Sequence, residues 1–216
     1  MKVLIACEES QRICIEFRKR GHEAYSCDIQ ECSGGHPEWH ICGDALALIN
    51  GDCSFETEDG VKHLIEGKWD LLIAHPPCTY LTTAGATSLF NKDHSIKSQE
   101  RYEKGLEAKD FFLQFYNADC PHICVENPLP MKIWELPPYT QIIHPHYFGS
   151  EFQKRTCLWL KNLPPLRRTH WIENPIPTSK ADWFQRSCKD RPKNRSKTFP
   201  EVAFAIAEQW NDITNN

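Results

Sequence analysis

Short apolar runs alternate along the chain with stretches in which apolar residues recur at helical spacing. The short runs predict strands at residues 3–7, 24–28, 69–74, 122–126 and 155–160, and the third of these stops abruptly at two prolines. Helices are predicted at residues 10–21, with Ser10 as cap and Gly21 at the end, at residues 57–66 and 99–117, and after Pro200. This alternation is typical of an α/β protein.

Strands joined by helical crossovers run parallel and are covered on both faces, so we expect a doubly wound sheet. Ligands of such sheets bind beyond the carboxyl ends of the strands. After Leu129, prolines divide the chain into short pieces, and a regular pattern returns only in the last helix. We therefore expect a core over residues 1–162, a short irregular segment over residues 163–193, and a C-terminal part over residues 194–216 whose helix packs back on the core.

Charge is distributed unevenly along the chain. The formal net charge is −4, yet residues 153–198 hold 12 Lys and Arg against 3 acidic residues. A basic stretch on an acidic body suits contact with nucleic acid phosphates on one face, although a solvated basic surface has the same composition. The 11 cysteines come without a secretion signal, and no apolar run approaches the ~18 residues of a membrane span. We expect reduced thiols, a cytoplasmic protein and no membrane partner.

Polar side chains follow the first two predicted strands. In nucleotide-binding α/β folds the first turn wraps the ligand, an acid at the end of the second strand accepts the ribose hydroxyls, and a further acid can read the adenine amino group. Asp28 and Asp44 have these placements, although ordinary polar residues at strand ends would look the same. The first turn lacks the glycines of a dinucleotide fingerprint, which favours an adenosine cofactor without phosphates, such as S-adenosylmethionine. The expected cofactor contacts here are Ala6, Glu8, Glu9, Ser10, Asp28 and Asp44.

A thiol and a carboxylate follow the next two strands. Cys78 ends a His-Pro-Pro-Cys turn, and Glu126 stands at the end of the following strand. A thiolate that attacks a pyrimidine ring needs charge relief at ring nitrogen 3, and a glutamic acid with a raised pKa can supply it. Arg155 is the candidate cation that would favour the thiolate. A structural cysteine and a capping or solvated glutamate remain open as alternatives.

The order and spacing of these motifs resemble those of compact DNA cytosine-5 methyltransferases of the phage or prophage type. The Pro-Pro-Cys turn at residues 76–78 is similar to the family's nucleophile motif, and Glu126-Asn127 to its glutamate motif. Residues 149–156 resemble its arginine motif, and residues 194–200 its closing motif. The resemblance spans most of the chain and implies a Rossmann-like methyltransferase fold that binds S-adenosylmethionine.

The resemblance also implies a reaction. Cys78 would add to carbon 6 of a flipped cytosine, Glu126 would steady ring nitrogen 3 and the amino group, and Arg155 would hold the carbonyl oxygen. Carbon 5 would then take the methyl group. Asp28 and Asp44 fall where the family places its ribose and adenine contacts, and Pro76 is a further expected cofactor contact.

The family's target-recognition region is reduced to about 30 residues, 163–193. We therefore expect low sequence specificity, or specificity supplied by a partner protein or a second copy of the chain. Trp171, Trp183 and Phe184 are available to stack on bases, or they form a small core. The residues expected to contact DNA are Thr79, Arg167, Arg168, Arg186, Lys189, Arg191 and Arg195, with Lys193 in the same basic group.

A cluster of soft ligands and three rival functions also need weighing. Cys27, Cys32, His36, His40 and Cys42 could together supply zinc ligands, but their spacing matches no known finger and a metal would crowd the proposed cofactor contacts, so we expect none. An amino-methyltransferase acting on DNA bases fits less well, because an imidazole at the first position of the Pro-Pro motif cannot accept two hydrogen bonds from an exocyclic amine. A non-catalytic nucleic-acid-binding module and an enzyme for free nucleotides or single strands stay open.

Overall fold

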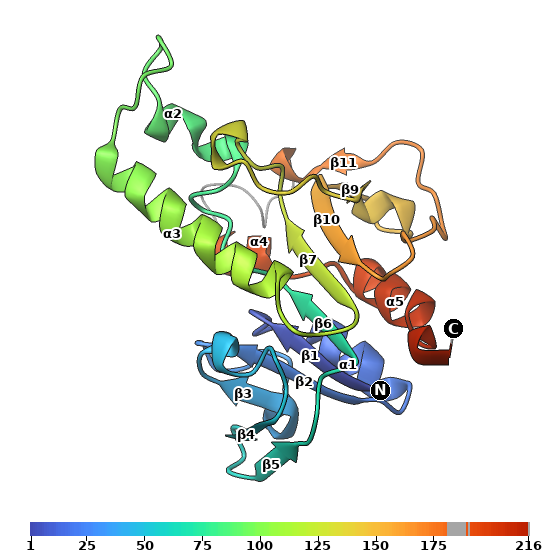
Figure 1. The fold of residues 1–216 in the computed structure, drawn as a ribbon. Coiled ribbons are helices and arrows are strands. Elements are labelled where there is room, and N and C mark those ends of the chain that lie inside the picture. Colours follow the sequence, from blue (N-terminus) through green and yellow to red (C-terminus); the bar gives the residue numbers. More distant parts are fainter. Residues whose placement is uncertain (181–188, 190, 216) are drawn as a thin grey trace.

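The computed structural model describes residues 1–180, 189 and 191–215. Its centre is a seven-stranded sheet with the order β3-β2-β1-β6-β7-β10-β8 (Figure 1). All neighbouring pairs are parallel except those of β10, which runs antiparallel to both β7 and β8. The strands are β1 (Lys2–Ala6), β2 (Glu23–Asp28), β3 (His40–Cys42), β6 (Leu71–Ala74), β7 (Ile123–Asn127), β8 (Gln141–Ile143) and β10 (Thr156–Lys161).

Helices cover both faces of this sheet (Figure 1). On one face α1 (Arg12–Lys19) packs against α5 (Pro200–Gln209), and on the other α3 (Gln99–Tyr116) packs against β7. The strand order reverses between β1 and β6, so the doubly wound, Rossmann-like α/β fold is confirmed. The shorter helices are α2 (Ala86–Leu89), α4 (Arg191–Ser196) and the 3-10 turns η1 (Pro37–Trp39), η2 (Ala45–Ala47), η3 (Thr83–Gly85), η4 (Lys132–Trp134), η5 (Pro145–Tyr147), η6 (Thr178–Lys180) and η8 (Ile213–Asn215).

Alternation along the strands divides the core into two layers. Val3 and Ile5 of β1 face α1 and α5, whereas Leu4 lies in the layer that contains α3. All three side chains are fully buried. The predicted strands over 3–7, 24–28, 69–74, 122–126 and 155–160 all coincide with sheet strands to within one or two residues, because runs buried on both faces are apolar at nearly every position.

The helix predicted over residues 57–66 is wrong. This segment contains the turn and second strand of a hairpin, formed by β4 (Cys53–Glu56) and β5 (Lys62–Ile65). Gly60 has φ +82°, and its N–H donates to the Thr57 carbonyl, which closes the turn. Phe55 and Ile65 pack into the same core layer as α3, so the hairpin covers the part of this face that lies beyond that helix. A second small sheet joins β9 (Phe152–Gln153) to β11 (Ile176–Pro177).

The first helix begins differently from the prediction. Ser10 does not cap α1; the N-cap residue is Gln11, in the left-handed conformation at φ 57°. The carboxylate of Glu8 instead accepts the N–H groups of Ile13 and Cys14, at 2.8 and 3.3 Å. The buried carboxylate of Glu8 therefore accepts the free backbone N–H groups at the start of this helix. In the described part of the chain, no helix is both long and apolar enough to cross a bilayer.

Candidate active site

Three titratable side chains stand side by side at the carboxyl ends of adjacent strands. Glu8 follows β1, His75 follows β6, and Glu126 lies near the end of β7, and the sheet order places β6 between the other two. The backbone N–H of His75 donates to the Ala6 carbonyl at 3.0 Å, which continues the pairing of β1 with β6. His75 is thereby fixed between the two acids.

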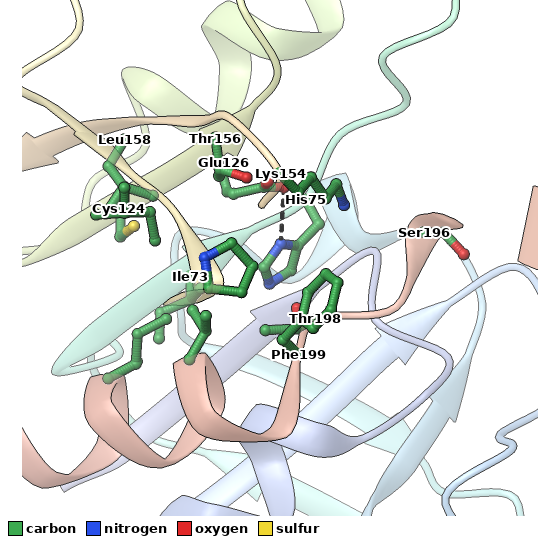
Figure 2. A pocket seen from close by; sticks show the side chains of 14 residues that line it. Ile73, His75, Cys124, Glu126, Lys154, Thr156, Leu158, Ser196, Thr198 and Phe199 are labelled. Carbon is green, nitrogen blue, oxygen red and sulfur yellow. Dashed lines mark hydrogen bonds and ion pairs between the residues drawn. The ribbon is translucent and has the colours of Figure 1, made fainter. Parts of the chain in front are cut away.

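His75 and Glu126 form a partly buried pair. Nδ1 of His75 lies 3.3 Å from Oε2 of Glu126, and the side chains are 10% and 23% exposed. Figure 2 shows this contact above a cavity between the sheet and the start of α5. Its volume of about 30 Å³ holds about one or two water molecules and is too small for a pyrimidine ring in the present conformation. The polar side chains lining it are His75, Glu126, Lys154, Thr156, Ser196 and Thr198.

Opposite charges surround the Glu126 carboxylate. Its burial acts to raise the pKa, but the hydrogen bond with His75, the charge of Lys154 and the contact with Thr156 outweigh burial, so the pKa of Glu126 is lowered. The sequence-based expectation of a raised pKa for this residue is therefore wrong in the ligand-free protein. The expectation did not include the imidazole and the ammonium group that the fold brings to this strand end.

The turn that carries Cys78 is clamped to the loop after β7. Asn127 donates from Nδ2 to the Pro76 carbonyl at 2.9 Å, and Thr83 N–H donates to the Leu129 carbonyl at 3.1 Å. The Cys78 carbonyl accepts from Leu81 N–H at 3.2 Å within its own turn. These bonds fix the thiol relative to the strand that carries Glu126.

Two cations lie near the thiol, and neither is Arg155. Burial and the charge of Glu126 raise the pKa of Cys78, while the positive charges of Lys154 and Arg195 act against that increase. Lys154 also donates to the Arg195 carbonyl at 3.0 Å, which ties it to α4. Arg155 instead exerts its charge on His144 and Cys157. The structure therefore does not bring Arg155 to Cys78, and sequence reasoning missed Lys154.

The ends of β2 and β3 bring Asp28, Asp44 and Cys7 together. Burial, together with the charges of Asp28, Cys27 and Asp44, raises the pKa of Cys7, so this thiol lies near both carboxylates. Cys7 has φ 59°, so the first turn adopts a left-handed conformation without a glycine. Ile29 follows Asp28 and is 81% exposed. This exposed apolar side chain next to Asp28 is a feature that the sequence analysis did not identify.

The other predicted cofactor contacts have partners within the protein. Glu8 accepts from the start of α1, and Glu9 accepts from the Ser33 hydroxyl. Ser10 and Pro76 are buried, and the Ala6 carbonyl already accepts the His75 N–H. Of the acids in the first turn, Glu8 is held by the start of α1, whereas Oε1 of Glu9 is buried and has no hydrogen-bond partner among the described residues.

The basic segment is partly packed and partly exposed. Arg167 and Arg168 are both exposed, and the guanidinium of Arg168 lies 4.2 Å from the Tyr147 ring centre and 4.6 Å from that of Trp171. Trp171 stacks on Tyr147 with the ring centres 5.1 Å apart. Arg101 donates to the Thr79 carbonyl at 2.9 Å. Lys189 and Arg195 are exposed, Arg191 begins α4, and Arg186, Trp183 and Phe184 lie outside the described residues.

His40 and Cys42, two of the candidate zinc ligands, form hydrogen bonds within the protein. Nδ1 of His40 lies 2.8 Å from the Ser26 hydroxyl, and Nε2 lies 2.9 Å from the Gln30 carbonyl. The Cys42 thiol donates to the Ile29 carbonyl. Within the described ranges, no group of three or more His, Cys, Asp or Glu residues is arranged to hold a metal ion.

No protein-family model and no curated protein matches the chain. Among solved structures, it is similar to an E. coli protein described as a candidate DNA modification methyltransferase encoded within a prophage. The two chains share 10% identity with a TM-score of 0.41 over 83% of this chain. The match spans 53% of the other protein's length.

Proposed function

We propose that this protein is a DNA methyltransferase that modifies carbon 5 of cytosine with S-adenosylmethionine as methyl donor. The observation that carries the proposal is the juxtaposition of Cys78 and Glu126. Their strands are neighbours, their loops are clamped together, and the charge of Glu126 acts on the thiol. A thiol fixed beside a carboxylate is the pair that nucleophilic attack on a pyrimidine requires.

The carboxylate acceptors at the end of β2 and after β3 suit the adenosine half of the cofactor. Asp28 is suited to the ribose hydroxyls and Asp44 to the adenine amino group, with the exposed Ile29 as an apolar surface for the base. The left-handed Cys7 supports a turn whose backbone approaches the ligand closely. When bound, S-adenosylmethionine would supply an electrophilic methyl group.

Within this proposal the protein's own residues handle the base and its protons. The thiolate of Cys78 forms a bond to carbon 6, which makes carbon 5 nucleophilic, while Glu126 hydrogen-bonds ring nitrogen 3 and the amino group. Loss of the carbon 5 proton to water then breaks the bond between sulfur and carbon 6 and releases the thiolate. Lys154 and Arg195 replace Arg155 as the cations that assist formation of the thiolate, since their charges act on Cys78.

The cytosine has to leave the duplex to reach Cys78, at a cost of a few kcal/mol that phosphate contacts would offset. Exposed Arg167, Lys189 and Arg195 are the described side chains best placed to supply them. The cavity beside His75 is too small for a base, so a base that enters it has to displace the segment at Ser196–Thr198, which lines it.

Nucleoside mass spectrometry tests the proposal. Mixed-sequence duplex and single-stranded DNA are incubated with S-adenosylmethionine and either the wild type, Cys78→Ala or Cys53→Ala, a partly buried cysteine of the hairpin. We expect 5-methylcytosine with the wild type and Cys53→Ala and none with Cys78→Ala. Methylation of an exocyclic amine would instead indicate an amino-methyltransferase, and activity that survives in Cys78→Ala would refute the mechanism.

A further inference from the structure

We propose that His75 is a positioning and proton-relay residue for Glu126, holding the carboxylate through Nδ1 and passing it a proton when ring nitrogen 3 of the substrate base takes one. This inference rests on the proposed function. The reaction motifs of the sequence assign no role to His75, which stands three residues before the nucleophile.

One ring nitrogen of His75 contacts Glu126, and the other has no hydrogen-bond partner in the described part of the chain. Nδ1 lies 3.3 Å from Oε2 of Glu126, so the other carboxylate oxygen can meet a substrate. Nε2 of His75 is buried and has no hydrogen-bond partner among the described residues. A buried nitrogen without a partner is costly, and this one lies against the cavity lined by Lys154 and Thr198 (Figure 2). A water molecule in that cavity would satisfy Nε2 and connect it to solvent.

The need for a proton at ring nitrogen 3 explains why Glu126 requires a proton donor beside it. The hydrogen bond with His75 and the charge of Lys154 lower the pKa of Glu126 and favour its charged carboxylate, yet ring nitrogen 3 must gain a proton as the bond between sulfur and carbon 6 forms. In the relay, nitrogen 3 takes a proton from Glu126, and Glu126 takes the Nδ1 proton of imidazolium His75, which becomes neutral. When carbon 5 loses its proton to water and the thiolate leaves, the proton on nitrogen 3 returns by the same route. The thiol proton of Cys78 exchanges with water, so the site regains its initial protonation.

The charged groups around the pair come from four elements. Glu8 faces His75 from the turn after β1, and the charge of His75 acts on the Glu8 carboxylate. Lys154 faces Glu126 from the link between β9 and β10, and Cys78 faces it from the turn after β6. Arg195 approaches the Cys78 side from α4. His75 is the group in this set that has a carboxylate on each side.

The first test needs no catalytic activity. The Glu126 carboxyl is titrated by carbon-13 NMR in the wild type and in His75→Gln and His75→Asn, two variants that keep a polar side chain but no titratable ring. We expect the pKa of Glu126 to rise in both. His122→Gln is the matched control, because His122 precedes the opposite end of β7, and it should leave the Glu126 titration unchanged. An unchanged titration in both His75 variants overturns the pairing.

The second test is the pH dependence of methyl transfer. If His75 supplies the proton, removal of its ring should change the pH profile of kcat. His75→Gln and His75→Asn should alter this profile and lose about 100-fold in kcat, with KM for DNA nearly unchanged. A lower kcat with an unaltered pH profile would show a merely structural role. If the wild type makes no 5-methylcytosine, the relay fails together with the proposed function, whereas the pairing is still decided by the carboxyl titration.

Discussion

Leu158 of β10 lies directly opposite Glu126 of β7 in the antiparallel register. Side chains of a strand alternate between the two faces of the sheet, so positions 156 and 154 share the face of Leu158 and Glu126. Thr156 and Lys154 accordingly line the cavity beside Glu126. Arg155, between them, is not among the residues that line this cavity, and its charge acts on Cys157. The strand register therefore determines that Lys154, and not Arg155, lies beside Glu126.

This relationship predicts unequal effects for two neighbouring substitutions. Lys154→Ala should raise the pKa of Cys78 further, because it removes a positive charge that acts on the thiol. We expect alkylation of Cys78 by iodoacetamide at pH 8 to slow several-fold in Lys154→Ala and to change little in Arg155→Ala. Peptide mass spectrometry separates Cys78 from the other cysteines.

Glu126→Gln should change the alkylation rate of Cys78 in the opposite direction. It removes the negative charge that raises the pKa of Cys78, so alkylation of Cys78 should become faster than in the wild type. Equal rates in Lys154→Ala and Arg155→Ala would contradict the assignment of Lys154.

The raised pKa of Glu8 predicts how the stability of the fold depends on pH. Burial raises its pKa from 4.5 to about 7, against the opposing influence of His75 and the N–H groups of Ile13 and Cys14. Between these two values the folded state holds the proton more tightly than the unfolded state, so the contribution of Glu8 to stability falls as pH rises through this window. A shift of this size corresponds to about 3 kcal/mol at most.

Glu8→Gln removes this titration and leaves a side chain of similar shape. Urea unfolding at pH 5 and pH 8 should show the wild type losing stability relative to Glu8→Gln between the two pH values. Glu103→Gln, an exposed position on α3, is the control and should follow the wild type at both. Stability curves of the wild type and Glu8→Gln that stay parallel over this range would rule out the raised pKa.

The proposed ribose contact predicts a binding defect. Asp28→Ala should weaken S-adenosylmethionine binding at least tenfold, because a carboxylate that accepts hydroxyl hydrogen bonds contributes about 1.5–3 kcal/mol. Isothermal titration calorimetry on the wild type, Asp28→Ala and Glu8→Gln measures the affinities. Glu8→Gln should bind nearly normally, since the Glu8 carboxylate is committed to the start of α1. Unchanged affinity in Asp28→Ala would exclude the end of β2 as the ribose site.

Much of the fold could be predicted from the sequence, because it depends on local pattern. The strands that carry Asp28, His75 and Glu126 are short apolar runs stopped by polar residues or prolines, and the order of the elements leaves few topologies. Such runs also predict which residues reach the carboxyl edge of the sheet. Cys78 and Glu126 could be paired for this reason.

The rest depends on three-dimensional context that the pattern does not contain. The pattern over residues 57–66 also suits a short helix, but the Asp59-Gly60 pair favours a turn, and the chain forms a hairpin there. The choice between Lys154 and Arg155 depends on a strand register set by β7, which lies far away in the sequence. The lowered pKa of Glu126 depends on His75, which a different strand brings to it.

Substitutions of two consecutive arginines should distinguish a residue that contacts DNA from one that also packs against aromatic rings. Both residues are exposed. The backbone N–H and carbonyl of Arg167 are held by Gln209, whereas the guanidinium of Arg168 lies over the rings of Tyr147 and Trp171. Arg167→Glu should weaken DNA binding and reduce the slope of log affinity against log salt by about 1, with an unchanged melting temperature, if its side chain contacts one phosphate.

Arg168→Glu should in addition lower the melting temperature by about 2–4 °C, because the two ring contacts together contribute on the order of 1 kcal/mol. Fluorescence anisotropy at several salt concentrations and differential scanning fluorimetry give the two readouts, with Lys109→Glu on α3 as a charge-matched control. A salt slope that stays at the wild-type value in both arginine variants would place the DNA elsewhere. A melting temperature that falls equally in Arg167→Glu and Arg168→Glu would show that ring stacking does not distinguish them.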